Sequence, residues 1–353
     1  AFIAFAPDRL LQVSLAGFSD HHVAEALFMS KAQGFPSEEE QLCTYRQLFD
    51  YCGERPVTVR TVDIGGDKPI RHMTFGPQEN PQLGLRAHRL YRYHPELLIT
   101  QIRAILRAAR PSTHLRILYP LVETLEQWDF IQELTQRAID SLEKDGEDLT
   151  GDFATGALIE TPSAVWECDR FARRADFVSV GTNDLVQYIF GVDRNNANSG
   201  FMYQPEHPVV LKVLRKVQAS ADDAGCPLTV CGEIAGNQRY LPLLIGLGVK
   251  NLSVTPSMAE ELEATLRSVS TELCRELAES CLGAGGTEEV RNILDEWHGT
   301  PRREKTQVGG AVDPVCKMTV DPEEAPFTLE VDGVQYYFCS RHCLKTFRRS
   351  PRT

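Results

Sequence analysis

The sequence lacks the features that mark membrane-bound, exported and nucleic-acid-binding proteins. No apolar run is long enough to cross a bilayer, and the first residues do not combine a basic region, an apolar core and a cleavage site. The 49 Asp and Glu residues outnumber the 37 Lys and Arg residues, which gives a formal net charge of −12. A protein that binds the phosphate backbone needs a basic surface. We therefore expect a cytoplasmic protein with neither a membrane nor a nucleic-acid partner.

A disulfide framework is also missing. The 10 cysteines are scattered along 353 residues, and only the last three are compactly spaced: Cys316, Cys339 and Cys343. Small disulfide scaffolds have dense cysteines in a short chain. Reduced thiols with one metal cluster near the C-terminus are the better interpretation.

The order of the predicted elements indicates one large α/β domain followed by a small one. Short β-branched runs alternate with amphipathic segments, as in a parallel barrel. If residues 10–17 and 83–86 are counted, eight strands are expected. The predicted fold is a TIM (β/α)8 barrel over residues 1–298, with an atypical first unit. Residues 299–311 are polar and carry glycine, which is typical of a linker, and residues 312–353 form a small α+β module.

Two carboxylates are predicted to meet at one end of the sheet. Glu160 follows the run Ala-Leu-Ile and Asp184 follows Val-Gly-Thr-Asn, so each is expected to end a buried strand. Two hard oxygen ligands, with Arg194 close behind, suit Mg2+ and an anionic substrate whose phosphate completes the shell. A lone carboxylate at a strand end is usually structural. The combination favours the functional interpretation.

Arg60 lies inside the β-branched run at residues 56–64. A buried cation is costly unless an anion meets it, and guanidinium offers phosphate a fork of donors. We interpret Arg60 as a phosphate ligand. The alternative is a structural ion pair between Arg60 and Asp63.

Five ordered motifs together resemble the phosphoenolpyruvate-utilising enzymes, and above all the C-terminal barrel of enzyme I of the sugar phosphotransferase system. The resemblance covers about residues 30–270. The motifs are Val-Asp63-Ile-Gly-Gly-Asp-Lys, Glu160-Thr-Pro, Gly-Thr-Asn183-Asp184-Leu, Val-Asp-Arg194 and Cys231-Gly-Glu-Ile-Ala-Gly.

The resemblance implies a role for each motif residue. Glu160 and Asp184 would hold Mg2+, or Mn2+, and Asn183 would orient phosphoenolpyruvate. Cys231 would protonate the departing enolate, although a cysteine at a strand end is by default buried filler. The substrate would be clamped by Arg60, Arg86 and Arg194. The phosphoryl group would pass to a histidine phosphocarrier protein or domain, and a homodimer is implied because barrels of this family pair through their C-terminal domains.

The sequence departs from the family pattern in two places. Relatives carry Gly-Leu-Leu-Arg-Thr-Glu before a Leu-Phe-Met motif, and its arginine holds the substrate phosphate, whereas residues 21–26 here are His-His-Val-Ala-Glu-Ala. No histidine stands in the Gly-Gly-x-x-Ser-His context that carries the phosphoryl group. We interpret His21 and His22 as solvated rather than as ligands or phosphoacceptors.

These departures leave three candidate functions. The first is Mg2+-dependent phosphoryl transfer from phosphoenolpyruvate to a protein histidine, which leaves pyruvate. The second is a catalytically impaired sensor of phosphoenolpyruvate or pyruvate coupled to the metal-binding module. The third is a metal-handling protein whose barrel is only a scaffold.

The C-terminal module carries its own metal motif. Asp313-Pro-Val-Cys316 is followed by Phe338-Cys339-Ser-Arg-His342-Cys343, a pattern that resembles the YHS family of heavy-metal-binding domains. A piece this small commonly needs a metal or a partner. Three thiolates, Cys316, Cys339 and Cys343, suit Zn2+ or Cu+, and His342 is a candidate fourth ligand. The alternative is three buried structural cysteines.

Overall fold

The computed structural model divides into two compact units. The first is built from residues up to 191 and from 204 to 298, and the second from residues 192–203 and from 299 onward. The described residues are 2–6, 9–14, 36–65, 78–147, 149, 151–194, 196, 198–299, 311–315, 319–320, 325–331 and 334–349.

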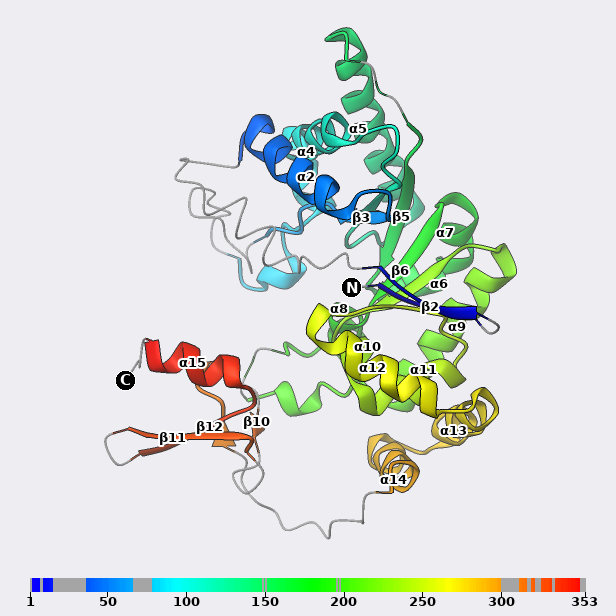
Figure 1. Ribbon diagram of the computed structural model, residues 1–353, viewed down its shortest axis with the longest axis vertical. Coiled ribbons are helices and arrows are strands. Elements are labelled where there is room, and N and C mark those ends of the chain that lie inside the picture. The colour runs from blue at the N-terminus through cyan, green and yellow to red at the C-terminus, as the bar shows by residue number, and fades with distance from the viewer. Residues whose placement is uncertain are drawn as a thin grey trace. The chain divides into compact units, whose positions relative to one another are not determined.

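A curled sheet of parallel strands forms the centre of the first unit (Figure 1). Its six parallel strands lie side by side in chain order, as a half-barrel. Each strand was predicted to within a few residues because β-branched and apolar residues dominate it. The strands are β3 (Val57–Arg60), β4 (Leu115–Tyr119), β5 (Ala154–Ile159), β6 (Phe177–Gly181), β7 (Leu228–Cys231) and β8 (Asn251–Ser253).

Among the described residues, six of the eight predicted parallel strands are present, and the other two predicted segments are not parallel strands of this sheet. β1 (Phe2–Ala6) pairs antiparallel with β8, and β2 (Arg9–Ser14) pairs antiparallel with β1, so the run at residues 10–17 becomes an edge strand of opposite direction. Residues 83–86 are not a strand either. Pro81 lacks an amide donor and favours a helical first position, and it opens the 3-10 helix η1 (Pro81–Leu83).

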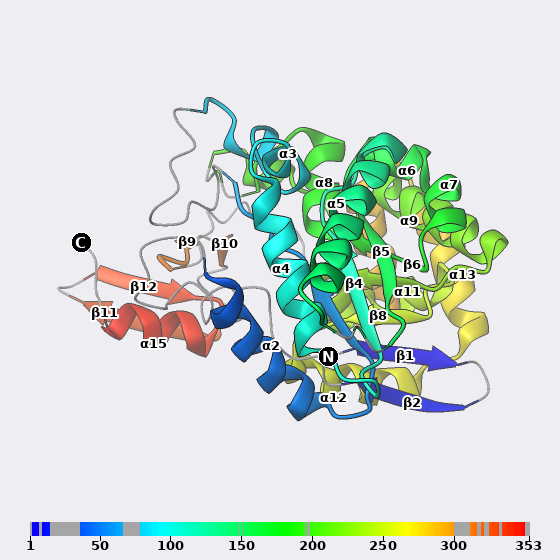
Figure 2. The same ribbon diagram turned by 90° about the horizontal axis from the view of Figure 1, so that it is seen from above.

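Helices follow the strands and pack beside one another around the sheet (Figures 1 and 2). α2 packs on α4, α4 on α5, α7 on α9 and α11 on α13. Their bounds are α2 (Glu38–Cys52), α3 (His88–Tyr91), α4 (Pro95–Ala108), α5 (Leu125–Lys144), α6 (Pro162–Trp166), α7 (Cys168–Arg174), α8 (Thr182–Phe190), α9 (Pro208–Ala224), α10 (Glu233–Gly236), α11 (Leu241–Gly246), α12 (Pro256–Ser268), α13 (Thr271–Gly283) and α14 (Thr287–Trp297), with two short 3-10 helices at η2 (Gly200–Met202) and η3 (Gln238–Tyr240).

Helix starts show which local signals decide a boundary. The predicted capping box at Ser37 and Glu40 is present, with reciprocal hydrogen bonds between side chain and backbone. The second predicted box, at Ser257, is wrong. α12 begins at Pro256 with Thr255 as its N-cap, because threonine is a favoured N-cap residue and proline suits the first helical position. This helix has no side-chain cap bond.

The second unit contains two small antiparallel pairs and one helix. β9 (Ala311–Val312) pairs with β10 (Thr319–Val320), and β11 (Phe327–Val331) pairs with β12 (Val334–Phe338). The last helix is α15 (Arg341–Arg349), and Phe338, Cys343 and Phe347 form a small core with it. The predicted linker falls almost entirely outside the described residues. Within the part of the chain that is described, no helix is both long and apolar enough to cross a membrane.

Candidate functional site

Glu160 and Asp184 lie at the same end of two adjacent strands. Glu160 directly follows β5, and Asp184 occupies the first turn of α8, which follows β6 without a break. β5 and β6 pair in parallel, so both carboxylates lie at the carboxyl edge of the sheet, where barrel active sites are built. Asp184 is therefore a helix residue. The prediction that it ends a strand is wrong.

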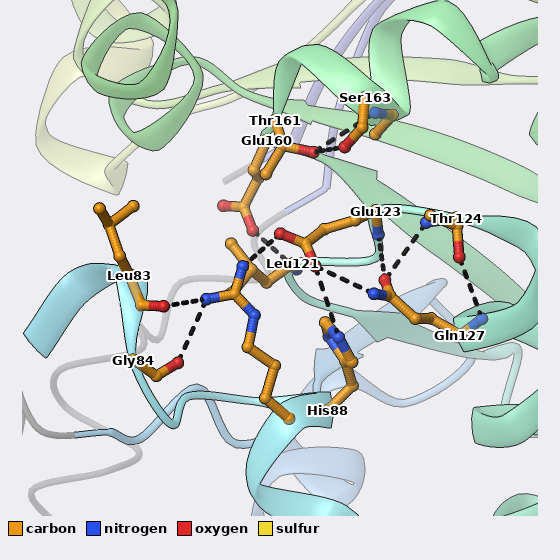
Figure 3. A network of polar contacts seen from close by, with 12 residues as sticks. Leu83, Gly84, His88, Leu121, Glu123, Thr124, Gln127, Glu160, Thr161 and Ser163 are labelled. Carbon is orange, nitrogen blue, oxygen red and sulfur yellow. Dashed lines mark hydrogen bonds and ion pairs between the residues drawn. The ribbon is translucent and has the colours of Figure 1, made fainter. Parts of the chain in front are cut away.

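The Glu160 side chain is buried and crosses the end of β6. It is 4% exposed. A Cβ atom on Gly181 would lie 2.4 Å from Glu160 Oε1 and 2.6 Å from its Cγ, so the glycine leaves the space that this side chain fills. Leu121 donates its backbone N–H to Glu160 Oε2 at 2.9 Å (Figure 3). Burial first, and then the Asp184 charge, raise the pKa of Glu160 to about 8.

Arg86 joins carboxylates from two parts of the chain. Its side chain is 1% exposed. Nε and Nη2 donate to Oδ1 and Oδ2 of Asp63, each at 2.7 Å, and Nη2 also donates to Asp184 Oδ2 at 2.6 Å. The planar guanidinium matches such a fork. A single bridge between the Arg86 and Gly65 backbones holds this segment against the residues after β3.

Arg60 is beside the same carboxylate. Its Nη1 lies 3.7 Å from Asp63 Oδ2, and its side chain is 20% exposed. The ion pair that was the alternative interpretation of Arg60 is therefore present. It does not exclude a substrate contact, because an arginine has donors beyond one such pair.

Asn183 and Cys231 lie where β7 approaches the start of α8. Asn183 Oδ1 accepts the Glu233 N–H at 2.9 Å, and Thr182 Oγ1 donates to the Cys231 carbonyl at 2.7 Å. Gly232 has a φ of +98°, and a Cβ there would lie 2.2 Å from Thr182 Oγ1. Only glycine fits this conformation and this contact, which keeps the end of β7 against the Asn183 turn.

The Cys231 thiol points into the sheet interior. It lies 3.2 Å from the Val180 carbonyl and packs against Leu118, Leu158 and Phe177. It is partly rather than fully buried. Both interpretations of Cys231, proton donor and interior filler, agree with this setting.

Arg194 is assigned to a different compact unit from Glu160, Asp184 and Arg86. It follows α8, and residues 192–203 belong to the second unit. Its predicted substrate contact stays a prediction. The segment with His21 and His22 lies outside the described residues.

In the second unit, three side chains offer ligand atoms to one point. Oxygen and sulfur atoms of Asp313, Cys339 and Cys343 all lie within 4.8 Å of one another, and the two sulfurs are 3.8 Å apart. Two thiolates and a carboxylate suit a soft or borderline cation. Cys316 lies outside the described residues, as does the His342 side chain.

Asp313 was not predicted as part of this centre. It is fully buried, and its two oxygens accept the backbone N–H groups of Val315 at 2.9 Å and Cys339 at 2.8 Å. Burial raises its pKa, but the hydrogen bonds from Cys339 and Val315 outweigh burial and lower it. Its place before Pro-Val-Cys316 was the available signal.

Comparison with known proteins identifies both units. A profile described as "PEP-utilising enzyme, PEP-binding domain" matches residues 22–271. The chain belongs to the PEP-utilising enzymes. A second profile, the YHS domain, matches residues 311–353. The family and the YHS domain indicated by the sequence motifs are therefore confirmed.

The relatives of this PEP-utilising chain are longer proteins. It is 37% identical over 270 residues to multiphosphoryl transfer protein 1 of Escherichia coli, an alignment that covers 76% of this chain and 32% of that protein. It is 34% identical over 273 residues to phosphoenolpyruvate-protein phosphotransferase of Staphylococcus carnosus, covering 77% and 47%. With the Enterococcus faecalis protein of that name the identity is 36% over 278 residues, covering 77% and 48%. The chain spans from about a third to about half of these relatives.

The PEP-utilising unit therefore brings together four of the residues expected at its site. Asp63 pairs with both Arg60 and Arg86, and Arg86 also pairs with Asp184. Glu160 lies at the same edge of the sheet as Asp184. Sequence reasoning missed the central place of Asp63 and the backbone contact from Leu121. Asp63 stood in the first family motif, whereas no motif contained Leu121.

Proposed function

We propose that this chain binds phosphoenolpyruvate with Mg2+, or Mn2+, and passes its phosphoryl group to a protein histidine, leaving pyruvate. The observation that carries the proposal is the pair of buried carboxylates, Glu160 directly after β5 and Asp184 in the first turn of α8, at one edge of the sheet, with Arg86 against Asp184. Membership of the PEP-utilising enzymes and the likeness to phosphoenolpyruvate-protein phosphotransferases support it.

The carboxylates fit a hard divalent cation. Glu160 and Asp184 supply oxygen ligands, and Gly181 leaves the Glu160 side chain room at the sheet edge. Burial and then the Asp184 charge raise the pKa of Glu160 and so disfavour its ionised form, and a cation bound between the two carboxylates would favour that form. A bound cation would offset the charge that develops on the phosphoryl and enolate oxygens.

The remaining site residues would act on the substrate. The N–H donors of Arg60, Arg86 and Arg194 would bind its phosphate, while Asn183 would orient it. As the bond between phosphorus and the enol oxygen breaks, a bond forms from phosphorus to the acceptor histidine nitrogen. The Cys231 thiol would then give its proton to the methylene carbon of the enolate, which yields pyruvate.

Calorimetric titration with phosphoenolpyruvate tests the proposal. We expect binding that requires Mg2+, and we expect Glu160→Ala and Asp184→Ala each to abolish it, because each removes an oxygen ligand. Glu38→Ala is the control: Glu38 pairs with Arg103 and Arg107 on the outer helices. Unchanged affinity in both site variants, with their fold intact, would contradict the assignment.

A second candidate function is a sensor that binds phosphoenolpyruvate or pyruvate without turnover. It is favoured by residues 21–26, which contain no arginine, since loss of one contact that stabilises the transition state can cost about 100- to 1,000-fold in rate. Incubation with phosphoenolpyruvate, Mg2+ and a histidine phosphocarrier protein decides between the two. Pyruvate release supports the transferase, and binding without release supports the sensor.

We further propose that the second unit binds Zn2+ or Cu+ through Cys316, Cys339 and Cys343. The YHS match and the two paired sulfurs support this. We also propose a domain at residues 1–298, a linker at 299–311 and a module at 312–353. The boundary of the compact units near residue 298 supports this division, whereas the grouping of residues 192–203 with the second unit does not. Closure of an eight-unit barrel and the homodimer remain parts of the proposal.

A further inference from the structure

A cluster of polar side chains lies beside the metal-ligand candidate Glu160. His88 and Arg89 of α3 both contact Glu123, which lies on the loop after β4. Figure 3 shows His88 beside Glu123. His88 Nε2 is 3.7 Å from Glu123 Oε2, and Arg89 Nη2 pairs with Glu123 Oε1. We call His88, Arg89 and Glu123 the His88 cluster. It connects two segments that are far apart in the sequence.

The His88 cluster reaches Glu160 through the loop after β4. Glu123, the carboxylate of the cluster, lies two residues after Leu121 on this loop, and the Leu121 N–H donates to Glu160 Oε2 at 2.9 Å. His88 and Leu121 are both fully buried. A displacement of the Leu121 backbone would therefore move a hydrogen-bond donor of the Glu160 carboxylate.

Backbone strain occurs at both segments that the cluster joins. Leu121 has a φ of +55° and Ala87 a φ of +47°, and among the described residues these are the only non-glycine positions with positive φ. Ala87 stands between Arg86, which holds Asp184, and His88. Such conformations persist only where the surroundings hold them, and they gather at functional sites.

Other contacts anchor the cluster to the same region. Arg89 Nη1 donates to the carbonyls of Leu83 at 2.7 Å and Gly84 at 3.2 Å. Gln127 Nε2 donates to Glu123 Oε2 at 3.0 Å. With both partners largely buried, at 25% and 19% exposure, the Arg89 and Glu123 pair differs from a solvated surface ion pair.

We propose that the His88 cluster positions Glu160: by fixing the strained Leu121 and Ala87 turns, it holds the carboxylate and the neighbouring Arg86 in the geometry that binds the cation. This inference rests on the proposed role of Glu160 as a metal ligand. His88 and Glu123 are positioning residues and need not touch substrate or metal.

Two measurements on the full chain test the proposal. The first is hydrogen exchange at the Leu121 amide, and the second is Mn2+ affinity without substrate, followed by the electron paramagnetic resonance of free Mn2+. We expect Glu123→Gln and His88→Leu to speed exchange at Leu121 and to weaken Mn2+ binding by about tenfold, which is typical for loss of a group that orients a metal ligand. Glu123→Gln keeps the size of the side chain, so it tests the idea even if His88→Leu fails to fold.

Glu38→Gln is the matched control. Glu38 also pairs with two arginines and has a similar exposure, 21% against 19% for Glu123. We expect it to change neither readout. Wild-type exchange at Leu121, or wild-type Mn2+ affinity, in Glu123→Gln would overturn the proposal. Hydrogen exchange at Leu121 is measured without ion or substrate. If the chain binds no phosphoenolpyruvate, the proposed function is refuted, and the exchange rate at Leu121 still tests the positioning role.

Discussion

Gly181 determines where the Glu160 side chain can lie. Glu160 Oε1, Cγ and Cδ all fall within 3 Å of the position that a Cβ on residue 181 would take. Any side chain at residue 181 would therefore overlap the Glu160 carboxylate and displace it. The end of β6 is therefore as important to the site as the carboxylate itself.

Gly181→Ala is expected to reduce Mn2+ affinity by about tenfold or more while the fold persists, because the added methyl group would overlap the Glu160 carboxylate and displace it. Gly283→Ala is the control, since a Cβ there meets nothing within 4 Å and its φ is not in the left-handed region. Equal Mn2+ affinity in Gly181→Ala and Gly283→Ala would show that Glu160 adapts without loss.

His88 predicts a pH dependence of stability. Burial, opposed by the Glu123 charge and aided by Arg89 and Arg92, lowers the pKa of His88 from 6.5 to about 4. The unfolded chain then binds more protons than the folded chain between these values. The free energy of unfolding that neutral His88 contributes is complete above pH 6.5 and is lost as the pH falls toward 4.

Denaturant unfolding at about pH 7 and about pH 5 measures this contribution. We expect the wild type to lose more free energy of unfolding over that interval than His88→Gln does, because glutamine does not titrate there. An equal loss in the two proteins would mean that His88 is not buried in its neutral form.

At the scale of elements, the helix N-termini show that the same local sequence pattern forms a cap at one position and not at another. Ser37 accepts the Glu40 N–H, whereas Ser257 caps nothing. Both positions carried the same Ser-x-x-Glu pattern. A proline precedes the serine in both cases, as Pro36 and Pro256, so the residue before the proline distinguishes them: it is Phe35 in the first case and Thr255, a favoured N-cap residue, in the second.

Ser37→Ala is expected to lower the free energy of unfolding by about 1 kcal/mol, because an orphan N–H at the start of α2 loses its acceptor. Ser257→Ala should change it by only a few tenths of a kcal/mol, roughly the size of a neutral surface change. Chemical denaturation of both variants measures the difference. Equal losses of the free energy of unfolding in the two variants would show that the hydrogen bond from the Glu40 N–H to Ser37 does not stabilise α2.

The strands show how far local patterns reach. Runs of β-branched residues predicted β3 to β8 well, because fully buried parallel strands are apolar on both faces. These runs do not predict the direction of a strand or the strand that it pairs with. β1 and β2 pair antiparallel at the edge, and nothing in a single run of apolar residues specifies its neighbour.

For the candidate site, the sequence likewise predicted individual residues but not the contacts between distant ones. Motifs placed Glu160 and Asp184 at neighbouring strand ends. The bond from Arg86 to Asp184 joins residues 98 positions apart, and the contact from Leu121 to Glu160 uses a backbone donor that has no sequence signature. Contacts of this kind arise from tertiary packing, so spacing alone does not reveal them.

At the scale of the whole molecule, the two units should respond differently to metal. The second unit has a core of only a few side chains, led by Phe338 and Phe347, so its folding is expected to depend on the bound cation. Calorimetry with added Zn2+ should raise the unfolding temperature of this unit alone. Cys339→Ser should abolish the rise, whereas Cys43→Ser, at an exposed thiol of the first unit, should leave it. A rise that survives Cys339→Ser would place the metal elsewhere.

The shared guanidinium of Arg86 also limits what can replace it. Its planar fork meets three oxygen atoms that come from the loop after β3 and from α8. A lysine would keep the charge but offer a single tetrahedral ammonium, which does not match three acceptors lying along one edge. This position therefore discriminates between two cations of equal charge by shape alone, and drift between arginine and lysine is not neutral here.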